Sequence, residues 1–282
     1  MTTLVSWFGC DSRGPASVYI ASDSRITWPA SSSSARATWD RGRKLFASRR
    51  FPEVFGYCGD VLFPTQLLSQ AIDLLDRDLL FSVALPSTEK AAALQSFIDA
   101  SIAKYTARPT LRFELVYACR SAEGLSCTFS LHHLMFDAGT WRTAGPIELP
   151  ASSDLVLNLG SGAVAVSDAH GRWRASASGG TSRGVFSAFQ DALRSASDPS
   201  SGGPAQLVGL YRTGPARVFG IVDASGAYVL GSAPTRLDGD SVEWFNAAFE
   251  RCDPRTRSRL PDATRQPRPR DLAAPSAGAS RR

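Results

Sequence analysis

The residues that could do chemistry start at the N-terminus, where Met1, Thr2 and Thr3 lead into an apolar pair. If Met1 is removed, which a small following residue such as Thr permits, Thr2 carries a hydroxyl and a free amine on one residue. Such an amine can act as the base that activates the hydroxyl as a nucleophile. An α-amino group titrates near about 8, so a modest decrease in its pKa lets it accept a proton at cellular pH. The alternative is that Thr2 and Thr3 form an ordinary chain terminus.

A terminal Thr nucleophile needs three further groups. A nearby cation keeps the amine neutral and lowers the pKa of the hydroxyl, and a carboxylate orients that cation. Backbone N–H groups must point at the developing oxyanion. Lys44, Asp23 and Gly59 could supply these groups, because each lies at the start or the end of a predicted strand. On spacing alone, Lys44 and Asp23 could equally be a surface ion pair.

Strands and helices are predicted to position these residues. Apolar alternation and turn residues predict a hairpin from strands at residues 3–8 and 16–21, joined by a turn-rich segment at 9–15. Further strands are predicted at 44–48, 54–58, 111–119, 127–135, 154–159, 206–211, 217–222 and 227–230. Helices are predicted at 64–75, 88–105, 183–196 and 241–251, the last with Asp240 as its N-cap. Separate runs of strands and helices predict an α+β layered domain.

Several segments, in order along the chain, resemble proteasome β subunits and the bacterial proteasome-like peptidases that work with a ring-shaped unfoldase. They are TTLV at residues 2–5, IASDSRIT at 20–27, RKLF at 43–46, FGYCG at 55–59, GSG at 160–162 and DPSSGG at 198–203. The resemblance implies an N-terminal nucleophile hydrolase with a four-layer αββα sandwich. It also implies hydrolysis of peptide bonds through an acyl-enzyme on Thr2.

Matched by position, the resemblance implies a role for each candidate site residue. Thr2 is the nucleophile and its amine the proton acceptor, Lys44 lowers the pKa of the hydroxyl, and Asp23 orients Lys44. The N–H of Gly59 belongs to the oxyanion hole. The other implied site residues are Asp198, Ser161 and Ser201 around the Thr2 amine, Thr27 as a backbone partner of an extended substrate, and Tyr57 in the pocket for the residue before the scissile bond. No cofactor or metal is expected.

The chain departs from this family in several loops. Thr2 to Asp23 and Asp23 to Lys44 are each 21 positions apart, longer than is usual in the family, with residues 29–37 as an insertion. Asp60 follows Gly59 and could repel acidic substrates. Three glycines between residues 162 and 181 predict that the helix after the GSG segment is short. We expect only Met1 to be removed, as in the bacterial branches of the family.

Composition divides the chain into a neutral body and a basic end. Residues 251–282 contain nine Arg and three Asp, so the other 250 residues carry 22 basic and 23 acidic groups. We predict one domain at residues 1–251 and a disordered Pro-, Arg- and Ala-rich tail at 252–282. No apolar run is long enough for a membrane span, and five scattered cysteines favour a reducing cytoplasm. A solvated tail is favoured over a nucleic-acid site.

The sequence therefore predicts a cytoplasmic threonine peptidase acting on peptides or unfolded proteins. Family membership would imply a homo-oligomer, as a ring or helical multimer. An ATP-dependent unfoldase is a candidate partner, but no segment of the sequence identifies one. Two alternatives stay open at this point. One is an amidase of the same fold acting on a small amide, and the other is a catalytically silent structural ring subunit.

Overall fold

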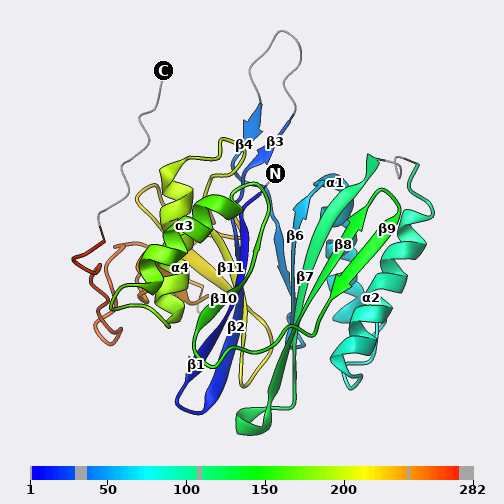
Figure 1. The fold of residues 1–282 in the computed structure, drawn as a ribbon, viewed down its shortest axis with the longest axis horizontal. Coiled ribbons are helices and arrows are strands. Elements are labelled where there is room, and N and C mark those ends of the chain that lie inside the picture. The colour runs from blue at the N-terminus through cyan, green and yellow to red at the C-terminus, as the bar shows by residue number, and fades with distance from the viewer. Residues whose placement is uncertain (1, 29–36, 107–109, 240–241, 273–282) are drawn as a thin grey trace.

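Two β-sheets lie at the centre of the molecule, with two helices beside each (Figure 1). The computed structural model describes residues 2–28, 37–106, 110–239 and 242–272. The first sheet has the order β10-β1-β2-β11-β12-β13, and β14 pairs with β12. Its strands are β1 (Leu4–Asp11), β2 (Gly14–Ser22), β10 (Asp154–Leu159), β11 (Gln206–Tyr211), β12 (Arg217–Val222), β13 (Ala227–Val229) and β14 (Trp244–Asn246).

The second sheet has the order β5-β6-β7-β8-β9, and all of its pairings are antiparallel. Its strands are β5 (Leu45–Ala47), β6 (Glu53–Gly59), β7 (Arg112–Ser121), β8 (Thr128–Asp137) and β9 (Thr140–Ala144). A separate two-stranded hairpin consists of β3 (Ile26–Thr27) and β4 (Thr38–Trp39). The helices are α1 (Leu62–Leu75), α2 (Ser87–Ile102), α3 (Ala163–Arg174) and α4 (Ser182–Ser195).

The central strands are apolar on both faces, which explains why they are buried. In β1, Leu4 and Phe8 enter one core cluster, while Val5 and Trp7 enter another. Because successive side chains of a strand point to opposite faces, this pattern requires packing on both sides of the sheet. The cluster that contains Leu4 and Phe8 is shared by both sheets, and it also holds Ile20 of the first sheet.

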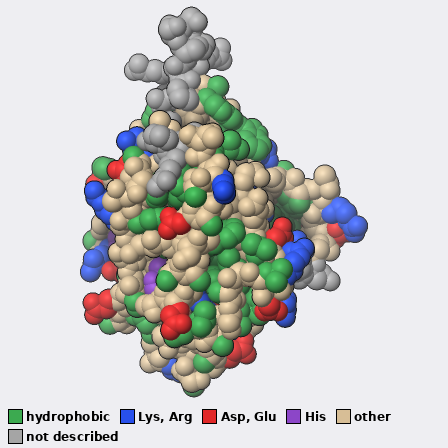
Figure 2. Space-filling view, turned by 90° about the vertical axis from the view of Figure 1, so that its right-hand side faces the viewer, with side chains coloured by type: hydrophobic (Ala, Val, Ile, Leu, Met, Phe, Trp, Pro, Cys, Tyr) green, Lys and Arg blue, Asp and Glu red, His purple; other side chains and the backbone are tan. Residues whose placement is uncertain are grey.

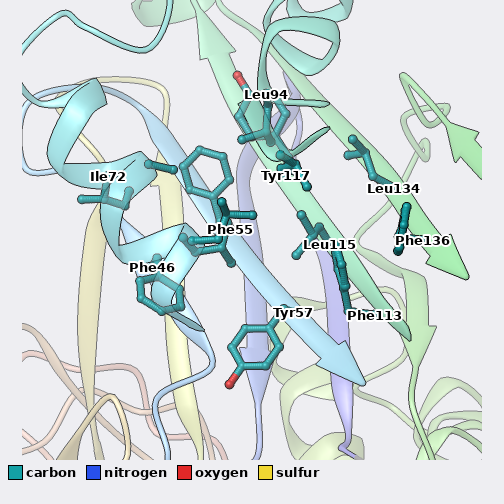
Figure 3. Packing of buried hydrophobic residues seen from close by; sticks show 14 of the residues in the cluster. Phe46, Phe55, Tyr57, Ile72, Leu94, Phe113, Leu115, Tyr117, Leu134 and Phe136 are labelled. Carbon is teal, nitrogen blue, oxygen red and sulfur yellow. The ribbon is translucent and has the colours of Figure 1, made fainter. Parts of the chain in front are cut away.

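Each sheet has a second core beneath its own helices. Phe186 and Phe189 of α4 pack on the first sheet, and Leu68 and Leu94 of α1 and α2 pack on the second. Figure 3 shows the second of these cores, with aromatic side chains of β6 and β7 turned toward the helices. A 3₁₀ turn at Gly124–Ser126 joins β7 to β8. Among the described residues, no helix is long and apolar enough to cross a membrane.

The predicted strands and the first three predicted helices are present, with shifts of a few residues at their ends. The first hairpin is longer than predicted, because β1 and β2 continue through much of the segment expected to be a turn. The register shifts between Gly9 and Cys10, so the pairing of the two strands is irregular close to the turn. The helix after the GSG segment spans 12 residues and continues through Gly171. Strand β9 was not predicted.

The helix predicted at 241–251 is wrong. Asp240 and Ser241 lie outside the described residues, and the segment that follows them forms β14, paired in parallel with β12. Trp244 lies opposite Gly220, where a Cβ would come within 2.1 Å of the indole ring. Aromatic residues are better strand formers than helix formers, and here the strand buries Trp244 and Phe245.

The prediction that the tail is disordered is also wrong for residues 252–272. Arg268 binds Asp191 of α4 with an Nη1–Oδ1 distance of 3.0 Å and lies over the Trp173 ring. Arg183 of α4 donates to the carbonyl of Gln266, and Leu272 packs on the core beneath α3 and α4. Arg268 thus ties the segment to α4, while Arg251 and Arg255 bind Asp262 and Asp238. Residues 273–282 lie outside the described residues.

Candidate active site

The centre of the candidate site is a buried ion pair between Lys44 and Asp23. Asp23 directly follows β2, and Lys44 directly precedes β5, so the two sheets bring the side chains together. The Lys44 Nζ–Asp23 Oδ1 distance is 2.7 Å, and neither side chain is exposed. Asp23 also accepts hydrogen bonds from the backbone N–H groups of Thr3, Arg25 and Gly202, at 3.0 to 3.1 Å. These donors fix the carboxylate in one orientation.

Burial lowers the pKa of Lys44, and the charge of Asp23 opposes this shift. Gln206, at the start of β11, holds the backbone around the pair and is fully buried. Its Oε1 accepts from the Lys44 N–H at 3.1 Å, and its Nε2 donates to the carbonyls of Asp23 and Gly42 at 3.0 and 2.8 Å. Nothing in the local sequence singles out Gln206, because its partners are about 160 to 180 positions away.

A second hydrogen-bond chain reaches the backbone nitrogen of Thr2. Thr2 N donates to Ser161 Oγ at 3.2 Å, and Ser161 Oγ donates to Asp198 Oδ2 at 2.6 Å. Ser201 contacts the residue after Thr2, because its hydroxyl shares a 2.5 Å hydrogen bond with Thr3 Oγ1. The three residues expected around the Thr2 amine therefore lie close to it, although Ser201 contacts Thr3.

The turn after β10 requires a glycine because it lies directly against the Thr2 backbone. Gly160 has a φ of +85°, and a Cβ there would come within 2.1 Å of the Thr2 carbonyl oxygen. The Gly162 N–H donates to that same oxygen at 3.3 Å. This close approach brings Ser161 within reach of the Thr2 nitrogen.

Arg25 links the two sides of the site and received no role from the sequence. Its guanidinium binds both carboxylate oxygens of Asp40, at 2.7 and 2.8 Å. It also donates to the carbonyl of Pro199 at 3.2 Å, and its Cζ would lie 2.8 Å from a Cβ at Gly202. Arg25 therefore holds the 198–203 loop against the chain that follows Asp23.

An open cleft of about 750 Å³ lies at the end of β6. Gly59, expected in the oxyanion hole, and Thr27, expected to bind substrate, both line it. Asp60 lies on the same wall, but its carboxylate accepts the Arg112 N–H at 2.7 Å. Asp60 is thus already engaged within the chain.

Tyr57 does not line this cleft, contrary to the sequence-based expectation. It is fully buried in the core beneath α1 (Figure 3). Its hydroxyl shares a 2.6 Å hydrogen bond with Thr65 and donates to the Arg43 carbonyl at 3.2 Å. Burial raises the pKa of Tyr57 to about 12. Tyr57 fills its own pocket, so a substrate side chain cannot enter there without displacing it.

The backbone of Gly59 gives a first testable prediction. Gly59 has a φ of +100°, and a Cβ there would lie 2.6 Å from the Arg112 carbonyl oxygen. We expect Gly59→Ala to reduce the free energy of unfolding by about 1–3 kcal/mol through backbone strain, to reduce it further through the clash with the Arg112 carbonyl, and to slow any reaction at the cleft. Gly139→Ala is the matched control, because Gly139 has a φ of +103° with nothing within 4 Å of its Cβ position. Equal urea midpoints for the two variants would contradict the role of this contact.

Comparison with known proteins identifies the type of fold. No protein-family model matches the chain, and no curated protein matches its sequence. Among solved structures it is similar to Anbu (ancestral beta-subunit) from Yersinia bercovieri. The TM-score is 0.50 at 14% sequence identity, over 81% of this chain and 87% of that chain. The likeness supports a proteasome-like fold, and at this identity it concerns the fold alone.

Proposed function

We propose that this chain is a threonine peptidase of the N-terminal nucleophile class, with Thr2 as the nucleophile. The observation that carries the proposal is the buried Lys44–Asp23 pair, whose carboxylate is bound by the N–H of Thr3. Burying two charges is costly unless they are paired and hydrogen-bonded. Such a pair beside a terminal hydroxyl is the arrangement that the chemistry of a Thr nucleophile requires.

The proposed reaction starts after the bond between Met1 and Thr2 is cleaved. The freed amine accepts the proton of the Thr2 hydroxyl, and the oxygen attacks a substrate carbonyl. The positive charge of Lys44 stabilises the developing alkoxide, and the N–H of Gly59 stabilises the tetrahedral oxyanion. The amine then passes its proton to the leaving amine, which leaves an ester on Thr2. Water hydrolyses this ester and frees the enzyme.

Ser161 and Asp198 would hold the amine in position during this cycle. Because Ser161 donates to Asp198, its oxygen is available to accept from the Thr2 nitrogen. The carboxylate of Asp198 would balance the positive charge that the amine gains when it takes the proton. Ser201 contributes through Thr3, by fixing the residue next to the nucleophile.

The proposal extends to the architecture and the assembly. Three separate cores, one between the sheets and one beneath each pair of helices, support a four-layer αββα sandwich. By analogy with the family that the sequence resembles, we propose a cytoplasmic homo-oligomer, as a ring or helical multimer. It would act on peptides or unfolded proteins with an ATP-dependent unfoldase as a partner.

Intact-mass analysis combined with a peptide epoxyketone, a covalent inhibitor directed at N-terminal Thr, tests the proposal. We expect the protein to lack Met1 and to take up one adduct, located on Thr2. Retention of Met1, or an adduct on another residue, would overturn the proposal. A panel of peptides and small amides then distinguishes a peptidase from an amidase, because only a peptidase needs the extended chain.

The pH dependence of the labelling rate should report on Lys44. Burial lowers the pKa of Lys44 from the ordinary value of 10.5, so the ammonium loses its proton at a lower pH than an exposed lysine does. If the positive charge is required, the labelling rate falls as pH rises through that pKa. Asp23→Asn removes the charge that favours the ammonium and should shift the fall to lower pH. A rate that stays constant to above pH 10.5 would contradict a role for the Lys44 charge.

A further inference from the structure

Two tryptophans are exposed on the small hairpin beside the candidate site. Trp39 ends β4 and Trp28 directly follows β3, and their side chains are 51% and 49% exposed. In Figure 1 the hairpin stands above the N-terminal end of β1. Figure 2 shows hydrophobic side chains gathered toward the top of the molecule. Large aromatic side chains that are exposed close together form a candidate binding surface.

The register of the hairpin places its large apolar side chains on one face. Ile26 pairs directly with Trp39, so their side chains lie on the same face. The Trp28 N–H donates to the Ala37 carbonyl at 3.0 Å, so the pairing continues past β3. Because side chains alternate along a strand, Trp28 shares the face of Ile26, and Thr27 lies on the other. Thr27 Oγ1 donates to the Ser200 carbonyl at 3.4 Å, which ties that other face to the 198–203 loop.

The three apolar side chains line the same cleft as Gly59. The remaining wall is also mainly apolar and includes Leu62, whose side chain is 68% exposed. The other residues of that wall are Val61, Phe63, Tyr105, Thr110 and Leu111. The cleft thus presents apolar surface on both sides.

The charged residues of the cleft already have partners within the chain. The Asp60 carboxylate accepts the Arg112 N–H at 2.7 Å, and the Arg112 guanidinium binds Asp137 at 2.7 Å. Neither group is therefore a dedicated partner for a charged substrate. What the cleft offers a peptide is apolar area beside the backbone of Gly59 and Thr27.

We propose that the cleft selects peptides carrying a large apolar side chain, aromatic or long aliphatic, which lies between Trp28 and Trp39 on one side and Leu62 on the other. This inference rests on the proposed function, because it takes the cleft as the substrate site. It follows from two observations together. Tyr57 fills the space behind β6, and the exposed apolar surface continues directly from Gly59 along the hairpin.

The first arm of the test measures binding without catalysis. A fluorescent peptide with phenylalanine at one position, and its alanine counterpart, are titrated against full-length Thr2→Ala by anisotropy. We expect the phenylalanine peptide to bind more tightly by about 10- to 100-fold, since a large apolar group in a hydrophobic site contributes an effect of this size. Trp28→Ala and Trp39→Ala, each added to Thr2→Ala, should remove most of this preference, and Trp28→Phe should retain it. Leu125→Ala is the control, because Leu125 is 67% exposed on the turn before β8.

The second arm measures Thr2 labelling by a small β-lactone that has no large side chain, in the chain that carries wild-type Thr2. Labelling in the wild type and in the Leu125→Ala variant, together with a phenylalanine preference that is lost only in the Trp variants, supports the inference. If the wild type is labelled and both Trp variants keep the preference for the phenylalanine peptide, the inference is overturned and the proposed function still stands. Absence of labelling in the wild type overturns the proposed function itself. A decrease in assembly mass in either Trp variant, measured by light scattering, would show that the tryptophans bind a second copy of the chain and would overturn the inference.

Discussion

Thr2→Ala is expected to abolish covalent labelling and to reduce peptide hydrolysis by about 10³-fold or more, because it removes the nucleophile and leaves only the stabilisation of the oxyanion. Thr2→Ser should keep part of the activity, since it retains a hydroxyl beside a terminal amine. Alanine and serine are both small, so Met1 should be removed from each variant. The measurement is the adduct mass with the epoxyketone, together with the rate of hydrolysis of a fluorogenic peptide.

Thr3 supplies the matched control for this experiment. It is the same type of residue one position away, and its hydroxyl contacts Ser201, while its N–H binds Asp23. Thr3→Ser retains both hydrogen-bonding groups and should label at nearly the wild-type rate. Equal loss of labelling in Thr3→Ser and Thr2→Ala would indicate a general disturbance of the terminus. Full labelling of Thr2→Ala would exclude Thr2 as the nucleophile.

Sequence patterns predicted most of the framework because most of the strands contain several apolar residues between turn residues. Strands β10, β11 and β12 have the predicted bounds, and turns or glycines flank each of them. The failure at β14 has a different origin. Residues 242–251 contain apolar positions that suit a helix, whereas pairing with β12, which lies earlier in the chain, makes a strand more favourable there.

Only the residues of the candidate site that lie in short sequence motifs were predictable. Asp23, Lys44, Ser161, Asp198 and Ser201 come together as expected. Asp23 and Lys44 directly adjoin recognisable strands, and the three others lie in the loops that follow β10 and α4. Gln206, Asp40 and the role of Arg25 were not predictable, because their partners lie in other segments of the chain. The prediction that Tyr57 lines the substrate pocket was wrong, because the alternation of side chains along a strand shows only that Tyr57 faces one side of β6. The sequence does not show that α1 covers that side.

Substitutions in the Lys44–Asp23 ion pair have the second large expected effect, and they allow stability and catalysis to be measured separately. Lys44→Met leaves the Asp23 carboxylate buried without its cation, so we expect the free energy of unfolding to fall by about 3–5 kcal/mol. Labelling of Thr2 should be lost even under conditions where the variant is folded. The double variant Asp23→Asn/Lys44→Met removes both charges and should recover much of the stability, but it should not recover labelling. Urea unfolding and labelling rates measure the two effects separately.

A second buried pair in the same chain makes this comparison decisive. Lys90 on α2 binds Glu53 with an Nζ–Oε1 distance of 2.8 Å, and the two side chains are 2% and 0% exposed. Glu53 also accepts the Tyr117 hydroxyl at 2.5 Å, within the core beneath α2. Lys90→Met should therefore cost about as much stability as Lys44→Met, yet the folded protein should still label at Thr2. If both variants lose labelling to the same extent, the loss reflects stability, and Lys44 has no chemical role. If only Lys44→Met loses labelling, the buried Lys44 cation acts on the reaction itself.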